Sequence, residues 1–92
     1  MTSTKEDGDV SLLGLKLYPN PSIEVLHVEL QEASTGSFKI YNTLGLLIHS
    51  EQMASQSRRT IDISFLSSGS YILSLESADG ELINQPFIKV SQ

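Results

Sequence analysis

The stretch Leu17-Tyr18-Pro19-Asn20-Pro21 places two prolines around one asparagine, directly after a run in which apolar and polar residues alternate. Each proline fixes its own φ at about −65° and has no backbone N–H to donate. Each also restricts the residue before it to extended backbone. A helix cannot accommodate this pattern. The stretch therefore predicts the end of a strand followed by a rigid corner, and it separates a tail from a β domain.

The segments on the two sides of this corner differ in composition. Residues 1–14 are mostly small, polar and acidic, which is typical of a flexible linker or tail. Residues 15–92 are predicted to form one small domain. Asp7-Gly8-Asp9 resembles part of a calcium-binding loop, but aliphatic residues follow where such a loop needs oxygen ligands. We therefore expect no metal site in the tail.

Short runs with period-two alternation follow the corner, separated by turn residues at intervals of roughly 8–12 residues, which is typical of a β-sandwich. In one run Leu26, Val28 and Leu30 fall on the same face of a strand, and in another Phe38 and Ile40 do so. No segment shows the apolar stripe of an amphipathic helix. The predicted strands are residues 15–18, 24–30, 37–41, 46–51, 60–63, 71–76 and 82–90. We therefore predict an all-β fold, an immunoglobulin-like antiparallel β-sandwich of about seven strands.

Turn residues predict how these strands connect. Residues 34–36, Ser-Thr-Gly, are expected to close a hairpin, and residues 42–45 to form a four-residue connection with its glycine at positive φ. Asp-Gly at 79–80 is typical of a two-residue hairpin turn. Residues 52–58 are polar and small and are expected to form a loop. Pro86 cannot donate to a ladder, so the last strand is expected to lie at a sheet edge or to be bulged.

Composition argues against several classes of partner. The chain has 6 Lys and Arg against 11 Asp and Glu, a net charge of −5, and its basic residues are scattered, so nucleic-acid binding is not expected. It has no cysteine, hence no disulfide and no thiolate site. No apolar run approaches the roughly 20 residues needed to span a bilayer, so the domain is not expected to insert into a membrane.

Catalysis is not expected either. His27 and His49 are isolated along the chain, without a carboxylate or serine at the spacing of a known catalytic family. There is no Gly-x-Ser-x-Gly elbow, and the glycines stand singly at turns rather than in a phosphate-binding loop. Asp62 lies between two isoleucines and is predicted to face solvent. We therefore predict no catalytic residue, no metal ligand and no cofactor.

Four stretches nevertheless occur in an order that is characteristic of one protein family. They are Leu17-Tyr18-Pro19-Asn20-Pro21, then Phe38-Lys39-Ile40-Tyr41-Asn42-Thr43-Leu44-Gly45, then the segment 61–71 that ends in Gly69-Ser70-Tyr71, and finally Phe87-Ile88-Lys89-Val90. Over residues 15–91 the chain resembles the type A C-terminal sorting domain of the type IX, or Por, secretion system. The residues that match the family's motifs are Pro19, Asn20, Pro21, Gly45, Gly69, Tyr71 and Lys89. Two departures are Asn42, where the family often has Asp, and the chain end Val90-Ser91-Gln92, which lacks a closing basic residue.

The resemblance implies a non-catalytic address label on a larger exported cargo protein. The cargo would reach the periplasm of a Gram-negative bacterium through an upstream signal peptide and cross the outer membrane through the type IX translocon. A sortase-like protease would then cut before the domain, and the cargo would be released or joined to surface lipopolysaccharide. The implied partners are the translocon, the sortase components and the upstream cargo domain. The implied location of the cargo is the cell surface or the medium.

Two further hypotheses concern how such a label would be read and removed. A partner could recognise the final hairpin, residues 71–90, by adding a strand to the edge that Pro86 interrupts. Cleavage is predicted within residues 1–14, the stretch expected to be accessible.

A function of a different class stays open from the residues alone. Tyr18, Tyr41 and Tyr71 could support sugar binding in a carbohydrate-binding or adhesive β-sandwich module of an extracellular protein. Each tyrosine lies at or beside a predicted strand end, where a ring packs while its hydroxyl reaches water or backbone. This placement favours a structural role over a binding platform.

Overall fold

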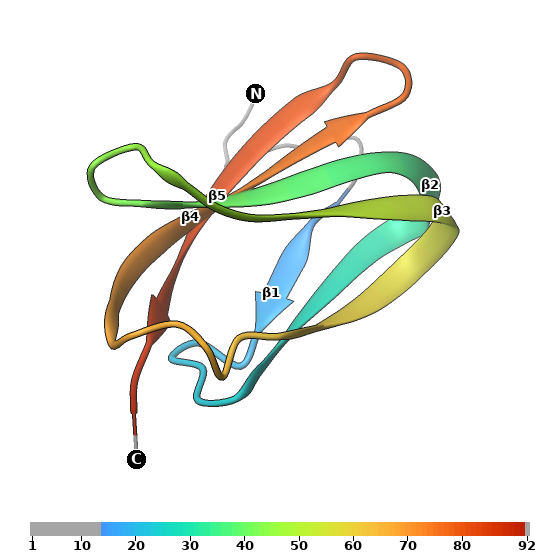
Figure 1. Ribbon diagram of the computed structural model, residues 1–92. Helices are drawn as coiled ribbons and strands as arrows, with labels where there is room; N and C mark the ends of the chain where they lie inside the picture. Colours follow the sequence, from blue (N-terminus) through green and yellow to red (C-terminus); the bar gives the residue numbers. More distant parts are fainter. Residues whose placement is uncertain (1–13, 92) are drawn as a thin grey trace, which may run out of the picture.

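The computed structural model describes residues 14–91, which form an all-β fold without a helix. The five strands are β1 (Lys16–Tyr18), β2 (Val25–Asn42), β3 (Leu47–Asp62), β4 (Gly69–Ser77) and β5 (Leu82–Lys89), as Figure 1 shows. Every strand pair is antiparallel. Residues 1–13 of the predicted tail, with the calcium-like stretch, lie outside the described residues. Since no helix occurs in the described part, none there could cross a membrane.

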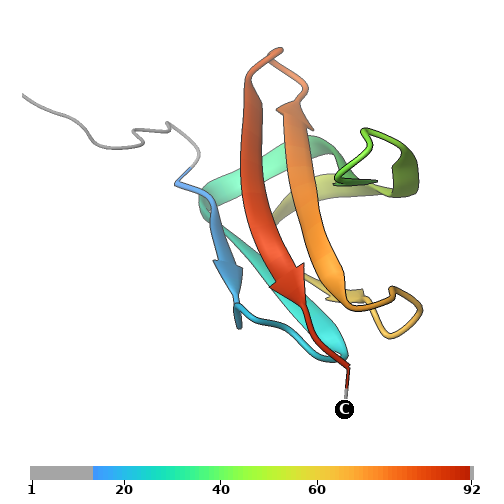
Figure 2. The same ribbon diagram turned by 90° about the vertical axis from the view of Figure 1, so that its left-hand side faces the viewer.

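Strands β2 and β3 bend, so that each takes part in two layers of the sandwich (Figures 1 and 2). The first part of β2 pairs with β1 and with the end of β3. The second part pairs with the start of β3 and with β4, which in turn pairs with β5. The strand order is therefore β1-β2-β4-β5, with β3 on the other side of β2.

The prediction of about seven strands was wrong in number, because residues 14–91 form five strands. The predicted strands 24–30 and 37–41 are parts of β2, and 46–51 and 60–63 belong to the continuous β3. The predicted hairpin at residues 34–36 and the predicted loop at 52–58 were also wrong, because both segments are strand. Register shifts between Glu29 and Gly36 and a positive φ of 53° at Ser55 bend the paired strands. Bulges of this kind turn a strand without releasing it from its ladder.

Gly36 is required at this bend because β4 lies against it. A Cβ on Gly36 would lie 2.3 Å from the carbonyl oxygen of Glu76 and 2.9 Å from the Cα of Ser77. The glycine that suggested a turn therefore permits a close approach of two backbones instead.

The other two predicted turns form at the expected places. The connection between β2 and β3 has Gly45 at a φ of 82°, and the Asn42 side-chain oxygen accepts hydrogen bonds from the N–H groups of Leu44 (2.9 Å) and Leu46 (3.0 Å). An amide oxygen thus performs the turn-closing role expected of the Asp that the family often has there. Between β4 and β5 a hairpin turn forms with Gly80 at a φ of 91°, but residues 78–81 connect the strands, so the prediction of a two-residue turn was wrong in length.

The core lies between the two layers and follows the predicted alternation. Leu26, Val28 and Leu30 are buried, as are Phe38 and Ile40. Each such side chain contributes roughly 1.5–3 kcal/mol when fully buried. Among residues 14–91, the buried apolar residues are Leu17, Leu26, Val28, Leu30, Phe38, Ile40, Met53, Ile61, Ile63, Leu66, Tyr71, Leu73, Leu75 and Phe87.

Candidate recognition site

The corner that opens the domain is bound to the end of the last strand. The Asn20 side-chain oxygen accepts a hydrogen bond from the Ile88 N–H at 2.9 Å. The Ser22 N–H donates to the Ile88 carbonyl and the Val90 N–H donates to the Ser22 carbonyl, both at 2.8 Å. Ser22 is fully buried and its hydroxyl donates to the Pro19 carbonyl. We call residues 20–22 together with 88–90 the clasp.

Lys89 lies inside the clasp rather than on the surface. Its side chain is only 3% exposed, and Nζ donates a hydrogen bond to the carbonyl of Leu66 at 2.8 Å. Its positive charge also helps to lower the pKa of Asp62. A partner that approaches from solvent would therefore not meet this amine first, and its immediate role is to hold the end of β5 to the loop between β3 and β4.

Gly69 and Tyr71 complete the same region from the start of β4. Gly69 pairs with Lys89 and has a φ of 156°, and no atom lies within 4 Å of the position a Cβ would take. Tyr71 is buried, its ring stacks on Phe87 at 5.7 Å between centroids, and its hydroxyl donates to the Ser67 carbonyl at 2.7 Å. This contact resembles the tyrosine corner of immunoglobulin-like domains.

Six of the seven motif residues thus lie on segments that meet at one end of the sandwich: Pro19, Asn20, Pro21, Gly69, Tyr71 and Lys89. Gly45 is separate, in the β2–β3 connection. It borders a hollow that is also lined by Tyr41, Ile72 and Asn84. Because Tyr71 belongs to the core, the three tyrosines do not form a common exposed platform for a sugar.

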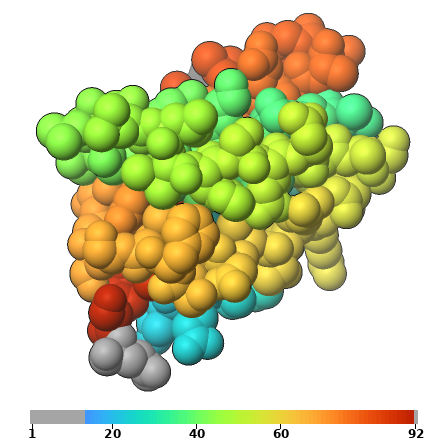
Figure 3. Space-filling model, viewed as in Figure 1, coloured from blue at the N-terminus to red at the C-terminus, as the bar shows by residue number. Residues whose placement is uncertain are grey.

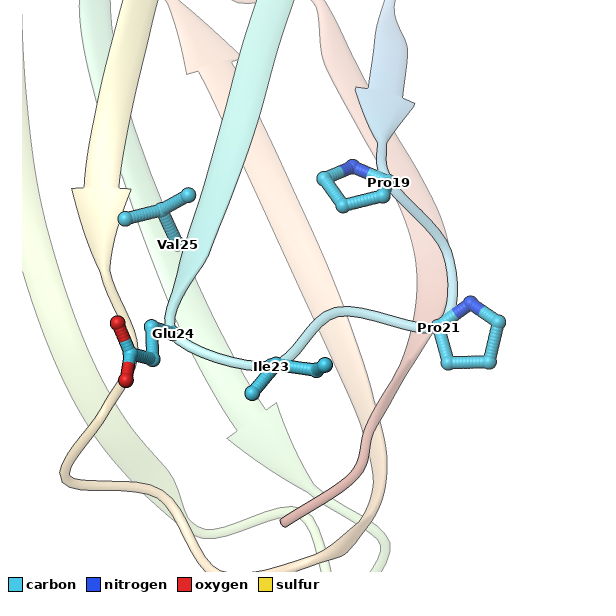
Figure 4. A pocket seen from close by; sticks show the side chains of 5 residues that line it. All are labelled: Pro19, Pro21, Ile23, Glu24 and Val25. Carbon is cyan, nitrogen blue, oxygen red and sulfur yellow. The ribbon is translucent and has the colours of Figure 1, made fainter. Parts of the chain in front are cut away.

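A shallow apolar groove lies beside the clasp (Figure 4). The rings of Pro19 and Pro21 stand on one side of it and Val25 on the other, with Ile23 between them. Glu24 completes the lining, so the groove could receive an apolar side chain with a polar group at its rim.

Two polar clusters were missed in the sequence. His49 is not isolated, because its Nε2 lies 2.6 Å from Oε2 of Glu51, whose Oε1 forms an ion pair with Arg59 at 2.7 Å. The spacing of two residues, which puts His49 and Glu51 on one strand face, was the signal available in the sequence. On another face, the Tyr18 hydroxyl donates to Glu29 at 2.8 Å, which raises the pKa of Tyr18.

Across residues 14–91, no three His, Asp or Glu side chains come together as they would around a metal ion. The charged clusters are explained as surface ion pairs and hydrogen bonds.

Asp62 faces solvent, as predicted, and caps the loop that follows β3. Its Oδ1 accepts hydrogen bonds from the hydroxyl (2.7 Å) and the N–H (2.9 Å) of Ser64. These bonds, and to a lesser degree the charge of Lys89, lower the pKa of Asp62 below its ordinary value of 3.8.

This lowered pKa predicts a pH dependence of stability. Deprotonated Asp62 stabilises the fold above pH 3.8, and the contribution is lost as the pH falls through the lower folded-state pKa. We expect Asp62→Asn to melt below the parent at neutral pH and the difference to shrink under acid. Ser64→Ala should weaken the acid dependence similarly. A melting-temperature difference that stays constant with pH would contradict this assignment.

The side chain of Asn20 is predicted to stabilise the clasp. Asn20→Ala should lower the free energy of unfolding by about 1 kcal/mol, the typical value of one hydrogen bond. Hydrogen exchange of the Ile88 amide should accelerate, because its acceptor is gone. Asn20→Asp keeps an acceptor at this position and serves as the matched control. Unchanged exchange at Ile88 in the alanine variant would argue against the clasp.

The architecture defines the class of protein: a small immunoglobulin-like β-sandwich module whose first and last segments are joined. Residues 16–89 match the family model described as the secretion system C-terminal sorting domain. The chain belongs to this family, the sorting domains of the type IX (Por) secretion system, which confirms the resemblance seen in the sequence.

The chain is also similar to part of one curated protein. The ulvan lyase NLR42 of Nonlabens ulvanivorans is 26% identical over 72 residues, which cover 78% of this chain. The match spans only 14% of that lyase, so its activity is a property of the larger protein.

Solved structures show the same fold. A DUF3244 family protein with an immunoglobulin-like β-sandwich from Bacteroides vulgatus superposes with a TM-score of 0.72 at 14% identity, over 90% of this chain and 91% of that one. CopC from Methylosinus trichosporium OB3b gives a TM-score of 0.54 at 15% identity, over 85% of this chain and 95% of that one. At such identities the likeness concerns the fold alone.

Proposed function

We propose that the domain is the address label of a larger exported protein and acts in its folded form. The family match over residues 16–89 carries this proposal. The short overlap with a much longer lyase supports the idea of a module attached to a cargo. The clasp offers a surface that exists only when the two ends of the domain have come together.

The proposed route follows from the family. The cargo enters the periplasm, the type IX translocon binds the domain, and the cargo crosses the outer membrane to the cell surface or the medium. A sortase-like protease then cuts within residues 1–14, and the cargo is released or joined to lipopolysaccharide. The proposed recognition residues are Pro19, Asn20, Pro21, Gly45, Gly69, Tyr71 and Lys89. We assign the buried ones, Tyr71 and Lys89, to shaping this surface.

A fusion experiment tests the address function. Residues 1–92 are attached to a reporter that carries a signal peptide, in a host with a type IX system. We expect the reporter outside the outer membrane, measured in the medium and by protease accessibility on intact cells. The same fusion in a strain without the translocon, and the reporter without residues 1–92, should stay in the periplasm. Equal export in all three would overturn the proposal.

The same fusion also tests the cleavage hypothesis. Mass spectrometry of the exported reporter should place its new C-terminus within residues 1–14. A cut inside the sandwich would rule out removal of the intact domain.

Gly69→Val is predicted to reduce export in this assay. A valine at a φ of 156° is strained, although no atom would clash with its Cβ. The strain should move the start of β4 away from Lys89 and lower export about tenfold, since such strain typically costs on the order of 1–3 kcal/mol. Ser70→Val, one residue later on the exposed side of β4, is the control. Normal export of Gly69→Val with a measurably altered fold would count against recognition of the folded domain.

A further inference from the structure

Three strands lie at sheet edges, and they differ in how accessible their outer main-chain groups are to an additional strand. The strand order leaves one side of β1, of β3 and of β5 without a strand neighbour among residues 14–91. Strand β1 has only 3 residues. Very short edge strands offer little to an additional strand.

The outer edge of β5 is largely closed as well. Both backbone groups of Ile88 bind residues of the clasp, so they point away from β4. Because backbone groups alternate in direction along an antiparallel strand, those of Pro86 point the same way, and proline has no N–H to offer. Pro86 therefore lies at an edge, as predicted, but it blocks pairing there. Strand addition to the final hairpin would be confined to residues 82–85.

The first part of β3 is open by comparison. Residues 47–57 contain no Lys, Arg or Pro, and their one acidic residue, Glu51, is paired with Arg59 and His49. The charged and proline residues that commonly protect an edge are thus missing over this stretch, and the register shift at its start leaves residues 49–53 in regular pairing with β2. The open part ends at Gln52, whose carbonyl accepts a hydrogen bond from Arg59 at 3.2 Å.

Aliphatic side chains are exposed along the same stretch. Leu44 is 81% exposed, Leu46 59%, Leu47 54% and Ile48 37%. Figure 3 shows the segment that contains them projecting at one side and running across the face of the molecule. Phe65, 57% exposed, lies next to this edge, with its ring 5.4 Å from that of His49. Aliphatic clusters of this kind on a protein surface commonly mark interaction sites.

We propose that residues 47–51 of β3 bind an extended segment of a partner protein by strand addition, flanked by Leu44 and Leu46. The free main-chain edge would supply the hydrogen bonds, and the exposed aliphatic residues would select apolar side chains at alternate positions of the incoming strand. This inference rests on the proposed function, in which the partner is a component of the secretion machinery.

The chemistry favours such a partner over a second copy of this chain. An antiparallel pair of two β3 edges centred on His49 would place Leu47 opposite Glu51, an apolar residue against an acid. Each copy would also carry a net charge of −5. The occupant should therefore be an aliphatic strand without an excess of acidic residues.

Two matched lysine variants test the surface in the export assay. Leu47 and Leu82 are the first residues of β3 and β5, and they are 54% and 60% exposed. Leu47→Lys should lower export at least about tenfold, because a lysine on an edge opposes strand addition. Leu82→Lys should leave export within about twofold of the parent, and both variants should melt within a few degrees of it. Equal export of the two variants would overturn the proposal.

Prolines at 49, 50 and 51 distinguish main-chain pairing from side-chain contact. Alternate N–H groups of β3 point toward β2 and toward the open edge. A proline that removes an N–H pointing to the open edge should leave the melting temperature unchanged and stop export. A proline at an adjacent position removes an N–H that bonds to β2, so it should lower the melting temperature. Residues 49–53 pair with β2 without a register shift, so His49→Pro and Glu51→Pro should behave alike and Ser50→Pro oppositely. Export that falls only in proportion to stability would contradict strand addition.

A measurement without export separates this inference from the proposed function. The purified 92-residue chain is titrated with a synthetic peptide of alternating valine and threonine that carries one lysine, and amide shifts are followed by NMR. Shifts at residues 47–51, and not at 82–85, support strand addition even if the fusion is not exported. No shift at 47–51 overturns it. A concentration-dependent dimer that Leu47→Lys abolishes would assign the edge to a second copy and would also overturn the proposal.

Discussion

Replacing Gly36 with alanine should lower the free energy of unfolding by about 3 kcal/mol or more, at the upper end of overpacking effects. The new Cβ would lie 2.3 Å from the Glu76 carbonyl oxygen. This contact is with backbone, which cannot rotate away as a side chain can, and Gly36 and Ser77 are held in register by the ladder between β2 and β4. Because small domains are stable by only about 5 kcal/mol or little more, this change should remove more than half of the stability and move the unfolding midpoint to a much lower urea concentration. Urea titration followed by circular dichroism measures this loss.

Gly45→Ala is the matched control. Gly45 has a φ of 82° but nothing within 4 Å of its Cβ position, so alanine there meets only conformational strain of about 1–2 kcal/mol. Equal losses for the two variants would show that close approach at Gly36 is not the cause.

Lys89→Glu should be the other strongly destabilising change, by about 3–5 kcal/mol at neutral pH. A carboxylate would replace the buried amine, face the Leu66 carbonyl that now accepts a hydrogen bond, and lie near the charge of Asp62. Burial should raise the pKa of the introduced carboxyl group, so the loss should diminish as the pH falls and that group takes up a proton. Denaturant titrations at several pH values measure both effects.

Lys89→Leu separates packing from charge. Leucine fills the buried position with an apolar side chain and removes one hydrogen bond, so the free energy of unfolding should fall by only about 1–2 kcal/mol. If Lys89 acts by holding the strand, export of the fusion should follow stability and Lys89→Leu should be exported better than Lys89→Glu. An undestabilised Lys89→Leu that is not exported would mean that the partner reads the charge itself.

Much of the fold could be predicted because its determinants are local. Alternation places Leu26 and Val28 on the buried face of one strand, and a glycine or asparagine at a turn fixes where a connection forms. The family was recognisable for a similar reason, since its motifs are short and ordered along the chain.

The strand count failed because a bend within a strand has the same local signals as a hairpin. Residues 34–36, and 52–58 apart from the buried Met53, are mostly small or polar in either case. Only the pairing of β2 with β3 over the whole length distinguishes a bent strand from a hairpin. The requirement for Gly36 comes from β4, which is distant in sequence.

The arrangement of the candidate site could not be predicted from the sequence for a related reason. Asn20 and Ile88 are 68 positions apart, and nothing near either residue indicates that they are bonded. The burial of Lys89 depends on the loop that supplies the Leu66 carbonyl, and a lysine in sequence is normally taken as exposed. The roles of the seven motif residues in recognition stay predictions.

The clasp can form only when the end of β5 is present and the domain has folded. A nascent chain that stops before Ile88 could already contain the core residues, yet the bonds of the clasp between residues 20–22 and 88–90 could not form. Contacts between such distant residues form only after the intervening chain has been ordered, so closure should be a late event in folding. A translocon that accepts only the closed form would thereby proofread its cargo, refusing polypeptides whose synthesis or folding had ended early.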